Sequence, residues 1–113
     1  MPKTYSSLRV KKRYVFFRVL SDGPVSYSDL KNAAFGCLLE WMGEESFGKA
    51  DVTFIRNLWD SRSRTGVLRC SHRFVDHVKL GLSMMHQTGD HRLSIQTLRV
   101  SGTIKGGRSK IRV

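Results

Sequence analysis

Cysteine and long apolar runs are what this chain has least of. Cys37 and Cys70 are the only two cysteines among 113 residues, and their spacing matches no zinc or redox motif. We therefore expect both thiols to be reduced and buried as small apolar groups. No run approaches the ~20 apolar residues of a membrane span, and the N-terminus lacks the apolar segment of a signal peptide. These absences predict a soluble cytoplasmic protein with no membrane partner.

Acidic residues are absent from both ends of the chain. Residues 1–14 contain five Lys or Arg, residues 99–113 contain another five, and neither segment contains Asp or Glu. Residues 15–98 contain the other ten basic residues and all nine acids. The middle of the chain is therefore close to neutral, and its ends carry almost all of the net charge of +11.

An excess of positive charge of this size indicates a polyanionic partner, most often a nucleic acid and less often a ribosome or membrane surface. The alternative is that the basic ends only keep the protein in solution. Asp and Glu would serve solubility equally well, yet neither occurs in the two ends. We therefore interpret the basic ends as an RNA-binding surface.

The hydrophobic pattern predicts a single domain, residues 1–113, with flexible basic ends over about 1–10 and 103–113. Alternating apolar residues predict four strands, at about 13–20, 52–59, 67–70 and 92–100. Helical spacing predicts two helices, at about 27–42 and 72–86, with Ser26 and Ser71 as their N-caps. Residues 44–50 are expected to be a connection.

This order of elements, β-α-β-β-α-β, is typical of the ferredoxin-like fold, which RNA-recognition sheets share. It predicts an α+β two-layer sandwich, in which a four-stranded antiparallel sheet has the spatial order 4-1-3-2 and both helices on one face. We expect the last strand to run antiparallel to the first. We expect the third strand to run parallel to the first, so that both start at the same end of the sheet.

Three basic segments converge at one end of the sheet in this predicted arrangement. They are the approach to the first strand, the loop before the third strand, and the exit from the last strand. The predicted RNA-binding residues are Lys11, Lys12, Arg13, Arg62, Arg64, Arg99, Ser101, Gly102, Thr103, Lys105, Arg108 and Lys110. Lys and Arg at these positions would neutralise phosphates, which gives affinity for RNA but little sequence specificity.

Two aromatic residues on the free face of the first strand, Tyr14 and Phe16, have two alternative roles. They could stack on RNA bases, as aromatic residues of RNA-recognition sheets do. They could instead pack under a loop or against a protein partner. The third strand has no aromatic residue where a stacking pair would need one, and the sequence leaves the choice open.

The residue types favour an accessory role over catalysis by the chain itself. His72 and His77 are five positions apart, off the i, i+4 face of a helix, and complete no zinc ligand set at a recognised spacing. No cluster of Asp and Glu for metal-assisted hydrolysis stands out. We therefore predict that the chain has no catalytic residue and no metal site.

Three blocks of the chain resemble the ribonuclease P protein component 2 family of archaea and eukaryotes. In the family's order, they are Leu8–Tyr14, Gly66–Cys70 and Leu98–Lys105. The segment Val100–Lys105 is the most specific, and the resemblance spans nearly the whole chain. The short length, without an acidic C-terminal extension, is similar to archaeal members. Gly106 and Gly107 depart from familiar members and predict a more mobile tail.

The resemblance implies a non-catalytic RNA-binding subunit of ribonuclease P, the endoribonuclease holoenzyme that removes the 5′ leader from precursor tRNA. In that family the RNA is the catalyst and uses Mg²⁺, so the chain itself is expected to bind no cofactor. The implied partners are ribonuclease P RNA, protein component 3 and a second copy of the chain within a heterotetramer. Precursor tRNA would be an indirect partner. The alternative is a ribosome- or rRNA-associated module without a role in tRNA processing.

Overall fold

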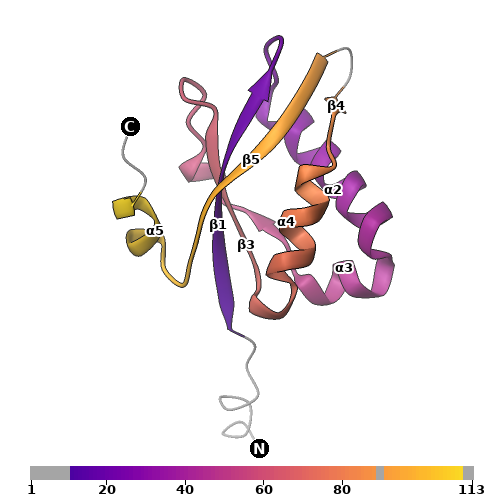
Figure 1. Cartoon of the computed structure of the whole chain (residues 1–113), viewed down its shortest axis with the longest axis vertical. Coiled ribbons are helices and arrows are strands. Elements are labelled where there is room, and N and C mark those ends of the chain that lie inside the picture. Colours follow the sequence, from indigo (N-terminus) through magenta and orange to yellow (C-terminus); the bar gives the residue numbers. More distant parts are fainter. Residues whose placement is uncertain (1–10, 89–90, 111–113) are drawn as a thin grey trace, which may run out of the picture.

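The computed structural model describes residues 11–88 and 91–110, without the side chains of residues 108–110. Its strands are β1 (Lys12–Ser21), β2 (Thr53–Phe54), β3 (Thr65–Ser71), β4 (Gln87–Thr88) and β5 (His91–Ser101). Its helices are α2 (Tyr27–Met42), α3 (Glu44–Ala50), α4 (Val75–Ser83) and α5 (Ile104–Lys110), with short 3₁₀ turns η1 (Arg56–Leu58) and η2 (His72–Phe74) (Figure 1). The predicted flexible arm at residues 1–10 lies outside the described residues.

Strand β1 lies at the centre of an antiparallel sheet with the order β2-β3-β1-β5-β4. Read from β5 to β2, this is the predicted spatial order of the four strands. The predicted number of strands is wrong by one, because Gln87 and Thr88 form the short strand β4 beside Arg92 and His91. The fold is therefore α+β with five antiparallel strands.

The predicted direction of the third strand is wrong, because β3 runs antiparallel to β1. Lys12 pairs with Ser71, and Arg18 pairs with Thr65. The hairpin from β2 to β3 makes these two strands antiparallel, while α2 and α3 connect β1 to β2. Strands β1 and β2 therefore run the same way with β3 between them, and β3 starts where β1 ends.

The side chains on one face of β1 pack into the core, as the alternating pattern predicted. Val15, Phe17 and Val19 are each no more than 2% exposed. The helical residues packed in the same core include Leu30, Ala34, Leu38, Val78 and Leu82. Burial of each large apolar side chain contributes roughly 1.5–3 kcal/mol, so this face holds α2 and α4 on the sheet.

Helix α2 has the predicted limits and the predicted cap. The hydroxyl oxygen of Ser26 accepts a hydrogen bond from the amide of Asp29 at 3.1 Å, which satisfies one of the free amides of the first turn. The helix ends at Gly43, whose φ of 84° is a conformation that favours glycine. That residue turns the chain directly into α3.

Residues 44–50, expected to be a connection, form the helix α3 instead. Glu45 in its first turn and Lys49 in its last turn suit the helix dipole, and their charged groups lie 3.1 Å apart. Phe47 packs edge-on against Phe35 of α2, with ring centroids 5.6 Å apart. Contact with α2 therefore stabilises a segment too short to be a stable helix alone.

Two other predicted elements are shorter than expected. The strand predicted at 52–59 has ladder pairs only at Thr53 and Phe54, because the chain then turns into η1. The helix predicted at 72–86 is divided into η2 and α4, with the Ser71 hydroxyl accepting a hydrogen bond from the Arg73 amide at 3.4 Å. None of the helices in the described residues has the length and apolar content to cross a bilayer.

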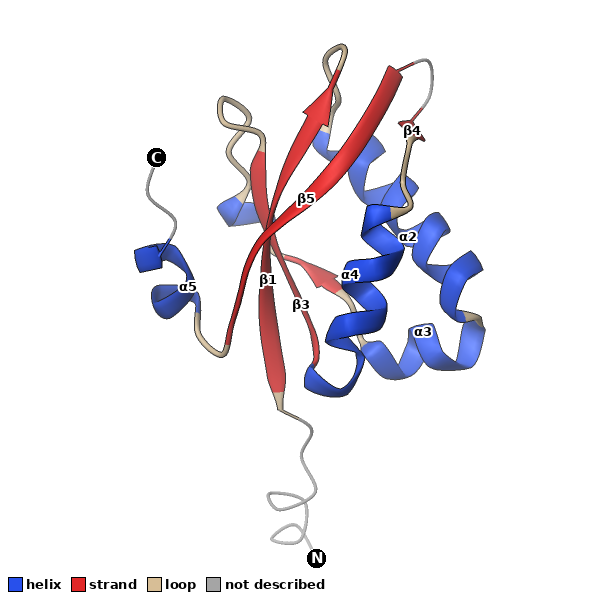
Figure 2. Ribbon diagram, viewed as in Figure 1, coloured by secondary structure: helices blue, strands red, loops and turns tan. Residues whose placement is uncertain are grey.

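The two predicted helices, α2 and α4, lie on one face of the sheet as expected. The unpredicted helix α5 lies on the other side of β1 and β5 (Figure 2). The tail, expected to be flexible from residue 103, is helical from Ile104 to Lys110. Gly107 rests directly on the ring of Phe16, which is only 5% exposed. Glycine at this position thus permits a close approach of helix to sheet.

Gly107→Ala tests this contact. An added Cβ would collide with the buried Phe16 ring, so we expect the free energy of unfolding to fall by about 1–3 kcal/mol. Gly36→Ala in α2 is the matched control, because nothing lies within 4 Å of its Cβ position, and it should gain up to about 1 kcal/mol. Urea denaturation measures both changes. A Gly107→Ala chain as stable as the unaltered chain would contradict the contact.

Candidate nucleic-acid interface

The start of β1 and the end of β5 lie side by side, as predicted from the sequence. Tyr14 pairs with Ser101, and Val15 pairs with Val100. The guanidinium of Arg13 lies beside Gly102, 3.8 Å from the position that a Cβ would take there. The segments Lys11–Arg13 and Ser101–Lys105 therefore meet at one end of the sheet, which we call the basic end.

Arg62 and Arg64 lie at the opposite end of the sheet, and the predicted convergence of three basic segments is wrong for their loop. The amide of Val19 donates a hydrogen bond to the carbonyl of Arg64 at 2.8 Å. The Arg64 guanidinium donates to the carbonyl of Ser21 at 3.4 Å. Because β3 is antiparallel to β1, the loop before β3 lies beside the end of β1. A role for this loop in RNA binding stays a prediction.

The antiparallel direction of β3 brings other cations to the basic end. Arg69 pairs with Tyr14, and the amide of His72 donates to the carbonyl of Lys11 at 2.9 Å. Arg73, the next residue in η2, is exposed. Neither arginine was predicted as a site residue. The signal that would have found them is the requirement that neighbouring strands alternate in direction in an antiparallel sheet.

Lys12 is already paired with an acid at the basic end. Its Nζ lies 2.6 Å from Oδ2 of Asp51, and its side chain is 34% exposed. The hydrogen bond from Lys12 and its charge, with a smaller contribution from the charge of Arg69, lower the pKa of Asp51. The carboxylate therefore stays ionised at neutral pH and offsets one of the cations that a phosphate would meet.

The turn between β5 and α5 is shaped by its own hydroxyl groups. The Ser101 hydroxyl accepts a hydrogen bond from the Thr103 amide at 3.2 Å, and the Thr103 hydroxyl accepts one from the Gly106 amide at 2.9 Å. Gly102 and Lys105 are exposed beside it. The turn thus presents backbone and one lysine to solvent. The side chains of the other two predicted residues, Arg108 and Lys110, lie outside the described residues.

The two aromatic residues of β1, Tyr14 and Phe16, were predicted either to stack on RNA bases or to pack against protein, and the structure places them differently. Phe16 is buried beneath Gly107 of α5, so it packs against protein. Tyr14 is partly exposed, and so is Arg99, which pairs with Phe16 across the strands. Of these two aromatic residues of β1, only Tyr14 therefore keeps a partly exposed ring.

The two cysteines differ in burial. Cys70 is fully buried, and burial raises the pKa of its thiol to about 11. Cys37 is free like Cys70 but only partly buried, so the expectation of burial is right for one of the two. Among the described residues, no three His, Cys, Asp or Glu side chains lie together as a metal site would need. The predictions about metals and catalysis stay predictions.

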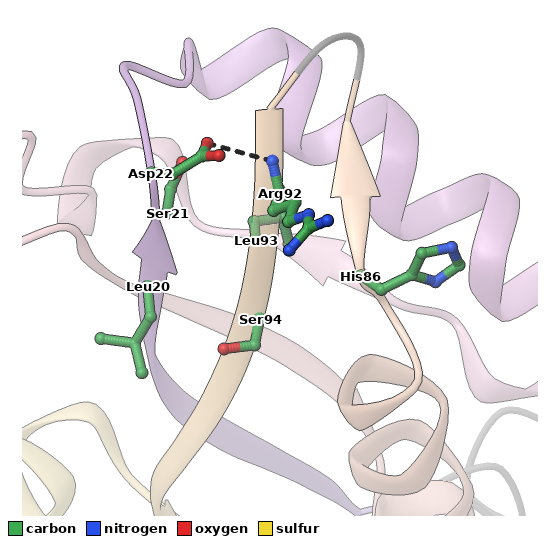
Figure 3. A pocket seen from close by; sticks show the side chains of 7 residues that line it. All are labelled: Leu20, Ser21, Asp22, His86, Arg92, Leu93 and Ser94. Atoms are coloured by element: carbon green, nitrogen blue, oxygen red, sulfur yellow. Dashed lines mark hydrogen bonds between the residues drawn. The ribbon is translucent and has the colours of Figure 1, made fainter.

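A shallow pocket of about 500 Å³ lies between the end of β1 and the start of β5, away from the basic end (Figure 3). The carboxylate of Asp22 accepts a hydrogen bond from the amide of Arg92 at 3.1 Å across it. His86 lines its other side. Its charges are of both signs, and it adds nothing to the basic end.

Residues 13–112 match the model of the Rpp14/Pop5 family. The chain is similar to Ribonuclease P protein component 2 of Pyrococcus abyssi, with 34% identity over 104 residues, 92% of this chain and 86% of the relative. It is 27% identical to the protein of the same name from Methanosarcina mazei over 110 residues, 97% of this chain and 91% of the relative.

Its fold resembles that of a chain in the cryo-EM structure of yeast ribonuclease MRP. The TM-score is 0.65 at 14% identity, over 82% of this chain and 75% of the other. At that identity the likeness concerns the fold alone. The family match, by contrast, begins at Arg13 in β1 and includes the end of β5 with Ser101–Lys105. By this match over nearly its whole length, the chain belongs to the Rpp14/Pop5 family.

Proposed function

We propose that this chain is a non-catalytic RNA-binding subunit of ribonuclease P, which supports the catalytic RNA in removing the 5′ leader from precursor tRNA. The observation that carries the proposal is the basic end, in which Lys11–Arg13 and Ser101–Lys105 lie together. It occurs in a chain whose relatives are named as ribonuclease P components. Cations and exposed backbone at such a surface suit phosphate oxygens.

In this proposal the RNA carries out the reaction and the Mg²⁺ ions serve the RNA. The chain screens repulsion between phosphates, so that a compact RNA forms with fewer bound metal ions. Its direct partners are ribonuclease P RNA, protein component 3 and a second copy of the chain in a heterotetramer. Precursor tRNA is an indirect partner, and the place of action is the cytoplasm.

Leader cleavage at low Mg²⁺ tests this mechanism. Ribonuclease P RNA with this chain and component 3 should cleave precursor tRNA at Mg²⁺ concentrations where the RNA alone is inactive. The RNA-free protein is the control and should leave precursor tRNA intact. Equal cleavage by the RNA at low Mg²⁺ with and without the proteins would contradict the proposal.

The alternative function is a ribosome- or rRNA-associated module. The net charge of +11 suits rRNA as well as ribonuclease P RNA, so charge alone does not separate the two. Copurification does, since a tagged chain should enrich ribonuclease P RNA over rRNA at a salt concentration that removes non-specific contacts. Enrichment of rRNA alone would favour the alternative.

Neutralising the first half of the basic end should weaken binding of ribonuclease P RNA. In Lys11→Gln, Lys12→Gln, Arg13→Gln, we expect the salt dependence of log K to flatten by about 0.7–0.9 for each lost phosphate contact. The charge-matched control is the helical-layer variant Lys31→Gln, Lys49→Gln, Lys79→Gln, which should keep its slope. Salt titrations of binding measure both. An unchanged slope in the first variant would place the RNA elsewhere.

Removing the acid that pairs with Lys12 should strengthen RNA binding. Asp51→Asn frees the ammonium group 2.6 Å from it, so we expect tighter binding and a slope steeper by up to about 0.9. Because the Lys12 ammonium lowers the pKa of Asp51, the carboxylate is ionised at neutral and mildly acidic pH, and the difference between the two chains should persist there. Glu40→Gln, at an exposed position of α2, makes the same charge change and should increase RNA affinity by less. Equal gains in the two variants would show that only net charge matters.

A further inference from the structure

Helices α2 and α4 lie side by side on the sheet, and two hydrogen bonds join them (Figure 1). The thiol of Cys37 donates to the carbonyl of Gly81 at 3.3 Å. The indole Nε1 of Trp41 donates to the carbonyl of His77 at 3.1 Å. The later residue of α2 thus contacts the earlier residue of α4, so the two helices run antiparallel along this contact.

The solvent side of this contact is apolar. Leu80 and Met84 are 51% and 42% exposed, and Trp41 is 42% exposed. They are three of the five large apolar side chains that are exposed among the described residues. Leu80 and Met84 follow His77 by three and seven residues, so they lie on the same side of α4. We call the surface of Cys37, Trp41, His77, Leu80 and Met84 the helix seam.

The indole of Trp41 is held in place by α4. Its polar N–H group is already bonded to that helix, and a Cβ at the buried Gly81 would come within 3.0 Å of its ring. The exposed part of Trp41 is therefore apolar ring surface in a fixed orientation. Such a ring loses little conformational entropy on binding, and Trp is among the residues that most often anchor protein interfaces.

Charge distinguishes the helices on this side of the sheet from the rest of the chain. Helices α2, α3 and α4 contain five acids and three lysines, in a chain whose net charge is +11. Burial, and then the charge of Glu40, raise the pKa of the Cys37 thiol, so Glu40 lies beside the seam. Asp76 is exposed four residues before Leu80, on the same side of α4. Lys79, the one lysine of α4, is partly buried.

This combination of apolar surface and acids disfavours two kinds of occupant. Carboxylates repel phosphate, and apolar side chains offer phosphate oxygens no donors, so RNA does not suit the seam. A symmetric contact between two copies of the chain would bring two acidic seams together, and like charges weaken such a contact. A protein surface with Lys or Arg beside apolar side chains complements the seam in both respects.

We propose that the helix seam binds an amphipathic helix of a protein partner, with Trp41, Leu80 and Met84 contacting its apolar stripe. Glu40 and Asp76 pair with Lys or Arg beside that stripe. The side-chain ridge of a third helix packs into the groove between two antiparallel helices, and recognition of an apolar helix face in a groove is a common mode of binding. The inference goes beyond the proposed function, because the seam includes no residue of the basic end.

The test uses two synthetic helical peptides of about fourteen residues, or four turns. The leucine–lysine peptide has Leu at helical spacing and Lys elsewhere, and the leucine–glutamate peptide has Glu in place of Lys. By calorimetry at low salt, the full chain should bind the leucine–lysine peptide about tenfold more tightly than the other. In the seam variant Leu80→Ser, Met84→Ser, its affinity should fall by about tenfold or more. The control Leu20→Ser, Leu39→Ser removes leucines that are 50% and 41% exposed outside the seam and should keep the affinity.

A charge variant tests the acids separately. Glu40→Gln, Asp76→Asn should weaken binding of the leucine–lysine peptide more than Asp29→Asn, Glu45→Gln does. The second variant makes the same charge change on the helices but away from the seam. Equal effects of the two would show that the acids of the seam pair with no cation of the partner, and the inference would fail.

Hydrogen exchange of the unaltered chain guards against a variant that fails to fold. The leucine–lysine peptide should slow amide exchange in α2 and α4 and leave β5 unchanged. Slowing only outside α2 and α4, or equal affinity of the seam variant and its control, would overturn the inference. So would tighter binding of the leucine–glutamate peptide. A chain that sedimentation equilibrium shows to be a dimer, with the seam variant a monomer, would assign the seam to a second copy instead. Loss of RNA binding in the seam variant would assign it to RNA, and either result overturns the inference.

Discussion

The antiparallel pairing of β1 with a strand on each side is the constraint on which the rest of this structure depends. Seven residues of β1 are in register with β3 and eight with β5. This pairing fixes which ends of the strands meet. It places Ser101 and Ser71 beside the start of β1 and the Arg64 loop beside its end. It also separates the strand into an inward set, Val15, Phe17 and Val19, and an outward set of basic and aromatic residues.

The two faces of the sheet are covered by different elements and differ in polarity. The inner face is covered by α2 and α4 and is apolar. On the opposite face, which carries Tyr14, Phe16 and Arg18 of β1, Gly107 of α5 lies on Phe16, and Phe16 and its partner Val67 are each only 5% exposed. The absence of a side chain at residue 107 is what lets so short a helix bury a phenylalanine. The rest of that face carries Arg18, Arg69 and Arg99, which are only partly buried, whereas full burial of an unpaired charge would be costly.

The positive charge gathered at the basic end is partly offset by one acidic residue. Asp51 pairs with Lys12 and lies near Arg69, so one cation is offset before any partner arrives. An exposed pair of this kind contributes little to stability. Its consequence is electrostatic, since it lowers the local potential that a phosphate backbone would meet. The exposed cations Lys11, Arg73 and Lys105 have no such acid partner among the contacts of the described residues.

The sequence by itself determined the local features of this protein. Alternation identified the inward face of β1, and a serine cap with a terminal glycine located α2 to the residue. Absent acids marked the two chain ends as basic. Each of these depends on residues that are neighbours in the chain, so a short window contains the information. The family resemblance followed from three such windows.

Only the tertiary structure decided which basic segments meet. An alternating pattern reads the same in either direction, so the pattern of β3 alone does not give its direction. The predicted antiparallel order 4-1-3-2 required β3 to run against β1, and because this was missed the Arg62 and Arg64 loop was predicted at the wrong end. Strand β5 has one extra residue where its register passes from Thr97 opposite Phe17 to Arg99 opposite Phe16, and this β-bulge depends on pairing with β1. The helical tail packs Gly107 on Phe16, a contact between residues distant in sequence. These features arise from contacts between residues distant in sequence, so they cannot be predicted from the hydrophobic pattern of a short segment.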